Sequence, residues 1–358
     1  MFLKNNWYVA GFGKELTTTP LARTLLGEPV VMFRTESGEV AALEDRCCHR
    51  NLPLSHGRVE GSTLSCGYHG MVYNTAGQCI RVPGQDVIPS GACVMHFPLI
   101  EKDGVLWIWM GDADKANTDR IPDYPFHSDP RWAHKGNHYT INCHHELIND
   151  NLIDLSHVGY VHGKTIGGTP GAHSEAQMST ERRDDGVTVR RFMPNTVPPP
   201  TYLRAMAFAG NIDRWMEIRF VPGLIRIYIG VNDAGEGFDE KTQMDKMGMR
   251  IFNGVTPETD NTTHYFWTAA HNFRVTEPEV TNNFYGEIAA TFEEDRTVVE
   301  AQQKRFGQFP NRTNVHIKTD AGGIHARRVM TQLMAAERLA NKDHQAPAAP
   351  VIRIAQAV

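Results

Sequence analysis

The sequence predicts an α+β protein in two parts, an all-β N-terminal domain followed by a domain that mixes strands with helices. From residue 7 to about residue 109 the chain consists of short β-rich runs separated by turn residues. Over residues 111–130 the composition shifts to Asp, Pro and Lys, which is typical of a linker between domains. Two segments with helical character, 143–161 and 282–306, follow the linker and flank further strands.

The strands expected in the first domain are four apolar runs, at 7–10, 30–33, 40–43 and 105–109. Glu36-Ser37-Gly38 and Ala76-Gly77-Gln78 lie between them and are typical hairpin turns. In the second domain the sequence predicts strands at 215–220, 224–231 and 264–267. We find no internal repeat in the chain.

Composition excludes several classes of protein. The 358 residues are 41% hydrophobic and contain no apolar run of about eighteen residues, so we expect a soluble protein and no membrane partner. The N-terminus lacks the apolar core of a signal peptide, and we therefore expect a cytoplasmic location. Six scattered cysteines do not suggest a disulfide framework, and a net charge of −5 argues against nucleic acid as the main partner.

A pair of mixed motifs, Cys47-Cys48-His49 and Cys66-Gly67-Tyr68-His69, dominates the first domain. Two cysteines and two histidines suit either a structural zinc or a [2Fe–2S] cluster in which histidines bind one of the irons. Zinc sites usually pair cysteine with cysteine and histidine with histidine, whereas each loop here mixes the two types. The mixed loops favour the cluster, with Cys47 and Cys66 on one iron and His49 and His69 on the other.

Three arginines lie close in sequence to these ligands, at Arg46, Arg50 and Arg58. They have two interpretations. They form either a solvated rim or a basic surface that receives an acidic electron-donor protein.

The second domain is rich in possible metal ligands between residues 149 and 162. Asn151, Asp154 and His157 recur at every third position and would share one face of a helix. His162 would point about 140° away from His157 on an ideal helix. Both histidines can bind one metal only if the helix distorts or ends nearby, and we expect Gly159 to be that place.

The long helix predicted over 282–306 carries an apolar stripe of Ile288, Phe292 and Val299. Asp295 interrupts this stripe. A carboxylate on a buried face is costly unless a cation or a metal accompanies it.

Two histidines and one carboxylate form the facial triad of non-haem Fe(II) oxygenases, which leaves coordination positions open for O2. We therefore assign His157, His162 and Asp295 to a mononuclear iron. Glu293 and Glu294 lie off the centre of the stripe and are expected to face solvent, with Glu294 left open as an alternative ligand.

These motifs resemble the Rieske-type ring hydroxylases and demethylases. The first pair resembles the Rieske signature C-x-H and C-x-x-H, and residues 151–162 resemble the pattern N-L-x-D-x-x-H-x-x-x-x-H. Residues 294–303 resemble the late ligand segment of the family. Within it, residues 6–9, 83–85, 320–323 and 327–328 resemble the vanillate O-demethylase oxygenase components. The chain departs from its relatives at Cys48, Met71 and His271, where Pro, Trp and Arg are common.

The resemblance implies an all-β Rieske [2Fe–2S] domain over 1–115 and a helix-grip-like catalytic domain of antiparallel sheet and helices over 116–342. A mobile tail would follow over 343–358. The implied activity is that of a terminal oxygenase that removes the methyl group of a methoxylated aromatic acid such as vanillate and releases formaldehyde. The alternatives are a methyl or ring hydroxylase of another aromatic substrate and, more distantly, a Rieske electron carrier. A zinc-stabilised binding protein is the alternative from the structural class.

The implied cofactors are a [2Fe–2S] cluster and a mononuclear Fe(II). The implied partners are the aromatic substrate, O2 and a reductase that carries flavin and a ferredoxin-type cluster. The family further implies a homotrimer, in which the cluster of one subunit lies beside the iron of the next. Asp154 would then bridge an iron-bound histidine and the neighbour's His69, or else only orient His157.

The resemblance leaves the substrate pocket least defined. We assign catalytic roles to Asp154 and Asn151. The candidates for substrate contact are Asn232, His264, His271 and the Arg327-Arg328 pair, and both histidines are equally well explained as core residues.

Overall fold

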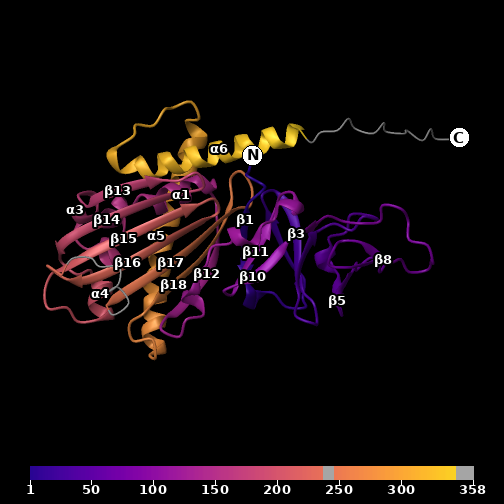
Figure 1. Ribbon diagram of the computed structural model, residues 1–358, viewed down its shortest axis with the longest axis horizontal. Coiled ribbons are helices and arrows are strands. Elements are labelled where there is room, and N and C mark those ends of the chain that lie inside the picture. Colours follow the sequence, from indigo (N-terminus) through magenta and orange to yellow (C-terminus); the bar gives the residue numbers. More distant parts are fainter. Residues whose placement is uncertain (237–245, 344–358) are drawn as a thin grey trace.

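The computed structural model describes residues 1–236 and 246–343, so the tail predicted over 343–358 lies outside the described residues except for its first position. The described N-terminal part contains three small antiparallel sheets, and the C-terminal part contains one antiparallel sheet of seven strands. Figure 1 shows the small sheets on one side of the molecule and the large sheet with its helices on the other. The predicted α+β fold, with the all-β part first, is confirmed.

The N-terminal sheets contain every strand predicted there. Their strands, in spatial order, are β1 (Trp7–Phe12), β11 (Val105–Trp109) and β10 (Leu99–Lys102); β2 (Leu21–Leu25), β3 (Glu28–Arg34), β4 (Val40–Glu44) and β9 (His96–Phe97); and β5 (Arg58–Glu60), β6 (Thr63–Ser65), β7 (Val72–Tyr73) and β8 (Cys79–Arg81). Both predicted hairpin turns are present, and their glycines, Gly38 and Gly77, adopt the positive φ that such turns require.

The segment predicted as a linker is packed into the molecule. It forms three short 3-10 turns, Ala113–Lys115, Thr118–Arg120 and Pro125–His127. Ile121 and Tyr124 between these turns are buried in a cluster that also contains aromatic residues of both parts, such as Trp7 and Phe252. The apolar cluster fixes the two parts relative to each other.

A glycine on β17 (Met247–Pro257) allows the two parts to approach closely. A Cβ on Gly254 would lie 2.6 Å from the side chain of Val9 on β1. Thr256 on the same strand donates a hydrogen bond to the Val9 carbonyl at 2.7 Å. A larger residue at position 254 would separate the strands.

The large sheet has the order β12, β18, β17, β16, β15, β14, β13. Its remaining strands are β12 (Ala133–Ile141), β13 (Gln177–Arg182), β14 (Val187–Thr196), β15 (Ile212–Val221), β16 (Leu224–Asp233) and β18 (Thr263–His271). The three strands predicted in this domain correspond to β15, β16 and β18. The other four were not predicted.

The helices cover one face of this sheet. They are α1 (His145–Ile153), α2 (Val158–Val161), α3 (Pro170–Ser174), α4 (Pro200–Ala205), α5 (Pro278–Gln308) and α6 (Ala321–Asp343). Ile229 and Ile251 face α5 and α1 in the main core, whereas Arg250 and Phe252 face the N-terminal part, because side chains alternate along a strand. The long predicted helix is confirmed as α5, and α6, which crosses the top of the sheet in Figure 1, was not predicted. In the described ranges no helix is both long enough and apolar enough to cross a membrane.

Candidate metal centres

The two cysteine and histidine loops meet at one end of the N-terminal part. Cys47 and Cys66 are each 2% exposed, whereas His49 and His69 are exposed and their ring centroids lie 4.6 Å apart. The thiols thus point into an apolar cluster with Leu54 and the imidazoles lie at the surface. This separation would fit a dinuclear cluster that is held by buried thiolates on one iron and by surface imidazoles on the other.

The buried thiols also need a positive partner. Burial raises the pKa of Cys66, and the neighbouring Cys47 raises it further. Two thiolates side by side in an apolar environment are therefore unfavourable without metal. Bound iron supplies the compensating charge, so the donor set fits the [2Fe–2S] cluster.

Tyr73 on β7 contacts both adjacent cysteines, a feature not predicted from the sequence. Its hydroxyl lies 3.2 Å from Cys47 Sγ and 3.2 Å from Cys48 Sγ, and it accepts a hydrogen bond from the Cys48 backbone at 3.3 Å. Cys48 is thus a partly buried thiol held by this tyrosine. Hydrogen bonds to ligand sulfurs change the reduction potential of such clusters.

Two of the three arginines near the cluster ligands form ion pairs with acidic residues of the same chain. Arg46 pairs with Glu44 at 2.7 Å, and Arg58 pairs with Glu60 at 2.6 Å. Arg50 is exposed. Two of the three arginines are therefore neutralised locally, which favours a solvated rim over a basic docking surface.

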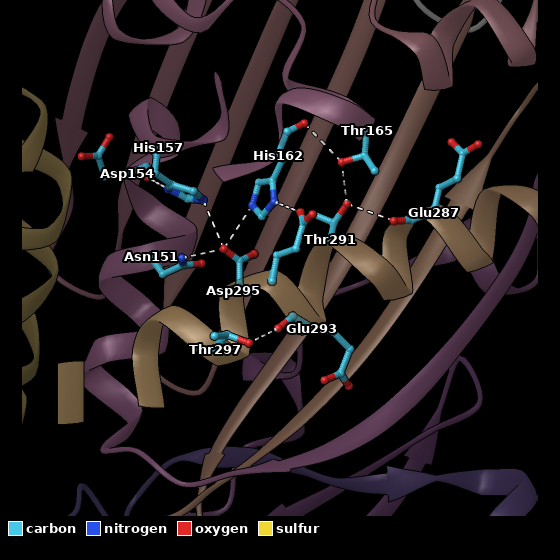
Figure 2. Close-up of polar contacts among 11 residues, drawn as sticks. Asn151, Asp154, His157, His162, Thr165, Glu287, Thr291, Glu293, Asp295 and Thr297 are labelled. Carbon is cyan, nitrogen blue, oxygen red and sulfur yellow. Dashed lines mark hydrogen bonds and ion pairs between the residues drawn. The ribbon is translucent and has the colours of Figure 1, made fainter. Parts of the chain in front are cut away.

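The second site is built where the first long helical pattern breaks. α1 ends at Ile153, Asp154 is extended, and a 3-10 turn Leu155–His157 leads into α2. The prediction that Asn151, Asp154 and His157 share one helix face is therefore wrong. The predicted distortion is present, and it brings His157 and His162 toward the same point (Figure 2).

The position of the break differs from the prediction. Gly159 lies inside α2, and a Cβ there would lie 2.3 Å from the Pro170 carbonyl oxygen. Gly159 is thus required for the close approach of α3 to α2. The breaks occur instead at Asp154 and at His162, where backbone angles leave the helical region.

Asp295 from α5 completes the triad. Its Oδ1 lies 3.1 Å from His162 Nε2 and 3.4 Å from His157 Nε2, and one potential ligand atom from each residue lies within 4.8 Å of the others. Asn151 Nδ2 donates a hydrogen bond to the same oxygen at 2.9 Å (Figure 2). The structure thus brings together His157, His162, Asp295 and Asn151.

Each histidine is oriented through its other ring nitrogen. His157 Nδ1 lies 2.8 Å from the Asp154 carbonyl oxygen, and His162 Nδ1 lies 2.6 Å from Glu294 Oε2. Both Nε2 atoms therefore point toward Asp295, as ligands of one metal must. Glu294, expected to face solvent, instead orients His162. Only the folded chain shows this contact, because the two residues are 132 positions apart.

The residues of the triad shift one another's pKa values. Burial would raise the pKa of Asp295, but hydrogen bonds from His157 and His162 lower it to about 2. Burial would lower the pKa of His162, but Asp295 and then Glu294 raise it. A metal that replaces the shared protons would satisfy the same buried groups. The two histidines and one carboxylate therefore fit a mononuclear Fe(II).

The carboxylate of Asp154 does not contact His157. Its Oδ1 accepts hydrogen bonds from the Ser156 backbone at 2.9 Å and from Arg191 Nη1 at 3.1 Å, and its Oδ2 accepts one from Ser156 Oγ at 2.9 Å. Arg191 is 2% exposed, so this is a largely buried ion pair. Within the chain, Asp154 orients His157 through its main chain alone.

Two spaces adjoin the triad. A surface groove of about 1280 Å³ is bordered by α1, α5, α6 and the segment before α6, and it includes Asp154. An internal cavity of about 60 Å³ lies on the other side. His157 and Asn151 border both spaces, so the triad separates the groove from the cavity.

The cavity is apolar apart from the triad and a few hydroxyl and amide groups. Strands β15, β16 and β17 and helix α5 supply most of its wall: Met216, Ile227, Ile229, Met249, Ile251, Ile288 and Phe292. Tyr202 from α4 and Thr291 from α5 add hydroxyl groups.

The predicted substrate contacts do not border this cavity. Arg327 borders the surface groove, where it pairs with Asp150, and Arg328 borders neither space. Asn232 lies one residue beyond Val231, which faces the core, so strand alternation directs it to the opposite face. His264 lies 3.0 Å from the Thr24 carbonyl and 3.0 Å from His138 at the junction of the two parts. His271 uses both ring nitrogens, toward the Phe273 carbonyl at 2.8 Å and a threonine hydroxyl at 3.0 Å. We therefore assign structural contacts to the two histidines and place Asn232 on the face of the sheet away from the cavity.

A buried histidine near the site makes stability depend on pH. His173 on α3 is fully buried, and burial followed by the nearby charges of Arg214 and Arg191 lowers its pKa to about 2. Below its unfolded pKa of about 6.5 the unfolded chain binds a proton that the folded chain excludes. The free energy of unfolding is therefore expected to fall as pH decreases, by up to about 1.4 kcal/mol per pH unit for this group.

Urea unfolding of the wild type and His173→Gln at pH 7.5, 6.5 and 5.5 measures this contribution. The stability difference between the two proteins should shrink by about 1 kcal/mol between pH 6.5 and 5.5. Loss of metal at low pH affects both proteins and cancels in the difference. Parallel pH dependences would contradict the prediction.

Comparison with protein families gives two matches. The Rieske [2Fe-2S] domain model matches residues 6–96, and the vanillate O-demethylase oxygenase C-terminal domain model matches residues 141–336. The first range contains both cysteine and histidine motifs, and the second contains the complete triad.

Individual relatives match over nearly the whole chain. The toluene-4-sulfonate monooxygenase system iron-sulfur subunit TsaM1 of Comamonas testosteroni is 37% identical over 94% of this chain and 98% of its own. The vanillate O-demethylase oxygenase subunit of Pseudomonas sp. strain HR199 is 37% identical over 94% and 96%. The crystal structure of dicamba monooxygenase bound to 3,6-dichlorosalicylic acid superimposes with a TM-score of 0.88 at 30% identity, over 94% and 99%.

Proposed function

Because the chain belongs to the vanillate O-demethylase oxygenase family of Rieske non-haem iron oxygenases, we propose that it removes the methyl group from a methoxylated aromatic acid such as vanillate. The observation that supports this proposal is the apolar cavity that lies directly against the triad. It can place an aromatic methoxy group beside a metal with open coordination positions.

When bound, the cluster would supply electrons one at a time and the mononuclear iron would activate O2. Cys47, Cys66, His49 and His69 would hold the first group, and the triad would hold the second. The overall reaction consumes one O2, two electrons and two protons. One oxygen atom enters a methyl C–H bond to give a hemiacetal, which splits into a phenol and formaldehyde, and the other leaves as water.

The protein's part in this reaction is to position the methyl group and exclude water. At about 60 Å³ the cavity is smaller than the roughly 300 Å³ or more of typical ligand pockets. Met216 and Met249 in its wall are flexible, and we propose that they move aside when the ring enters. Asn151 holds Asp295 in place on the metal side.

We further propose that the protein works as a head-to-tail homotrimer. Figure 1 shows β5 and β8, next to the cluster loops, at the end of the molecule remote from α1 and α5, with the other N-terminal sheets between them. Electrons would therefore pass from the cluster of one subunit to the iron of the next. A contact between unlike surfaces of this kind closes into a ring when its rotation allows.

Exposed apolar residues occur at both surfaces that this contact would join. At the cluster end these are Tyr68, in one of the cluster loops, and Ile80 on β8. Along the groove beside Asp154 they are Phe306, Phe309 and Val315. Exposed apolar groups gathered at two remote sites support their burial against each other. In this arrangement the groove would receive the cluster end of the neighbour, with Asp154 at its base.

Methyl hydroxylation is the second candidate, because the toluene-4-sulfonate relative is as similar in identity as the vanillate relative. Turnover assays separate the two. Purified protein, NADH, O2 and a reductase with flavin and a ferredoxin-type cluster would be supplied with methoxybenzoates, methylbenzoates and benzoate. We expect formaldehyde equal to the phenol formed from a methoxybenzoate. A benzyl alcohol from a methylbenzoate, with methoxybenzoates inert, would identify the hydroxylase instead.

Metal analysis tests the oxygenase against the electron carrier and the zinc protein. We expect about three irons per chain, two in the cluster and one in the triad, and a reduced-state EPR signal of a mixed-ligand cluster. About two irons per chain, unchanged in His157→Ala, would indicate an electron carrier. A colourless, zinc-loaded and folded protein would exclude the cluster altogether.

A further inference from the structure

Arg214 on β15 is a buried cation beside the cavity. It is 1% exposed and lies on the side of the strand that faces the helices, two residues before Met216 in the cavity wall. Its guanidinium lies over the ring of Tyr202, 4.8 Å from the centroid, and Nη2 donates to the Tyr202 hydroxyl at 3.2 Å. Nη2 also donates to the Ile166 carbonyl at 3.2 Å. Tyr202 and Ile166 both border the cavity.

The charge of Arg214 has no acidic partner in the described ranges. Its hydrogen bonds go to two carbonyl groups, those of Ile166 and Gly167, and to the Tyr202 hydroxyl, and its Nε is buried without a hydrogen-bond partner. Neutral acceptors compensate a buried guanidinium only partly.

Two other buried arginines show what distinguishes Arg214. Arg191 is paired with Asp154. Arg250 lies on the opposite face of the sheet among aromatic rings such as Trp132 and Tyr228, away from the cavity. Arg214 alone among these three combines an unpaired charge with contacts to cavity-lining residues.

We propose that Arg214, together with the Tyr202 hydroxyl, is the anchor for the anionic group of the substrate, a carboxylate or sulfonate on an aromatic ring. The proposal rests on the proposed function of the same site. A guanidinium offers five N–H donors, of which three are used here, and the two that remain are one on Nη1 and the one on Nε. Arg214 does not itself border the cavity, so an anion would enter beside Tyr202 and Ile166 to reach these donors. The anion would neutralise the buried charge while the apolar wall receives the ring.

This assignment predicts selectivity by charge. A neutral amide of the same shape would leave the guanidinium unpaired, whereas the acid would pair with it. We expect the wild type to bind aromatic anions at least about tenfold more tightly than the matched neutral amides. Arg214→Met should weaken anion binding by about tenfold to hundredfold and leave amide binding nearly unchanged. Arg214→Lys should retain part of the preference.

The experiment is titration calorimetry of the iron-loaded protein with two matched pairs, 3-methoxybenzoate with 3-methoxybenzamide and toluene-4-sulfonate with toluene-4-sulfonamide. The two pairs also show whether carboxylate or sulfonate is preferred. The control is Arg204→Met, since Arg204 is exposed on the same short helix as Tyr202 and pairs with Glu287 at 2.5 Å. It removes a nearby charge without reaching the cavity and should leave the preference intact.

A thermal midpoint measured without ligand separates anchoring from a structural role. Removing an unpaired buried charge should leave the midpoint of Arg214→Met equal to or above that of the wild type. A lower midpoint with an unchanged anion preference would show that Arg214 only supports the fold.

The proposal is overturned if Arg214→Met keeps the anion preference, or if the wild type binds amides as tightly as acids or binds none of the four probes. Formaldehyde assays on the same proteins keep the two hypotheses apart. Formaldehyde release with the preference unaffected in Arg214→Met would reject the anchor and keep the demethylase. A preference lost in Arg214→Met without formaldehyde from any methoxyarene would keep the anchor and reject the demethylase.

Discussion

His162→Ala is expected to abolish product formation, by a factor of at least about a thousand, while the [2Fe–2S] cluster remains intact. His162 is 1% exposed, its Nε2 lies 3.1 Å from Asp295, and its Nδ1 is held by Glu294. The substitution removes one of three metal ligands and leaves Asp295 as a buried carboxylate with one imidazole partner. Iron bound at this site should therefore be lost.

Iron analysis and EPR measure this effect. Iron should fall from about three to about two per chain, with an unchanged reduced-cluster signal. The matched control is His264→Gln, which alters another buried histidine whose contacts lie at the junction of the two parts. It should retain all of the iron. A His162→Ala protein that keeps about three irons per chain would show that the triad is not the iron site.

Asp154→Asn is expected to slow electron transfer between the two metal centres by about a hundredfold while both remain bound. The Asp154 carboxylate lies at the groove that would receive the neighbouring cluster, and its contact with His157 runs through the main chain. The amide keeps the shape and the main-chain contact but removes the negative charge. Arg191 then becomes a buried cation without its acidic partner.

Stopped-flow absorbance of the reduced cluster, mixed with O2 and substrate, measures the transfer. The expected result is slow cluster oxidation at unchanged iron content. Asp150→Asn is the control, since Asp150 lies in the same groove and pairs with Arg327, away from the triad. Loss of the mononuclear iron from Asp154→Asn would instead indicate that the carboxylate, through its bonds to Ser156 and Arg191, serves mainly to hold the main chain that orients His157.

The sequence alone singled out the residues that the fold brings together at both candidate metal centres. In the cluster motif each ligand pair is separated by only one or two residues, so local spacing specifies it. Asp295 was identified because the other positions of its stripe on α5 are apolar, and the structure places Ile288, Phe292 and Val299 in the core. Helix periodicity is regular enough to reveal one carboxylate on a buried face.

Local pattern could not predict how the triad is assembled. The regular spacing of Asn151, Asp154 and His157 suggested one continuous helix, but the chain leaves the helix at Asp154, whose side chain caps the following turn through Ser156. Tertiary contacts, including the close packing of α3 on α2, decide this conformation. Propensity along one segment does not contain that information.

The substrate cavity was decided entirely by the tertiary structure. Its wall comes from β15, β16, β17 and α5. Whether a strand residue faces the cavity depends on the register of the sheet, because a register shift of one residue moves every side chain of the strand to the opposite face. Asn232, His264 and His271 were chosen for their chemistry, yet the fold directs them elsewhere. Arg214 was not considered, because a single arginine in a predicted strand does not indicate a function. It becomes informative only when the structure shows that it is buried without an acidic partner.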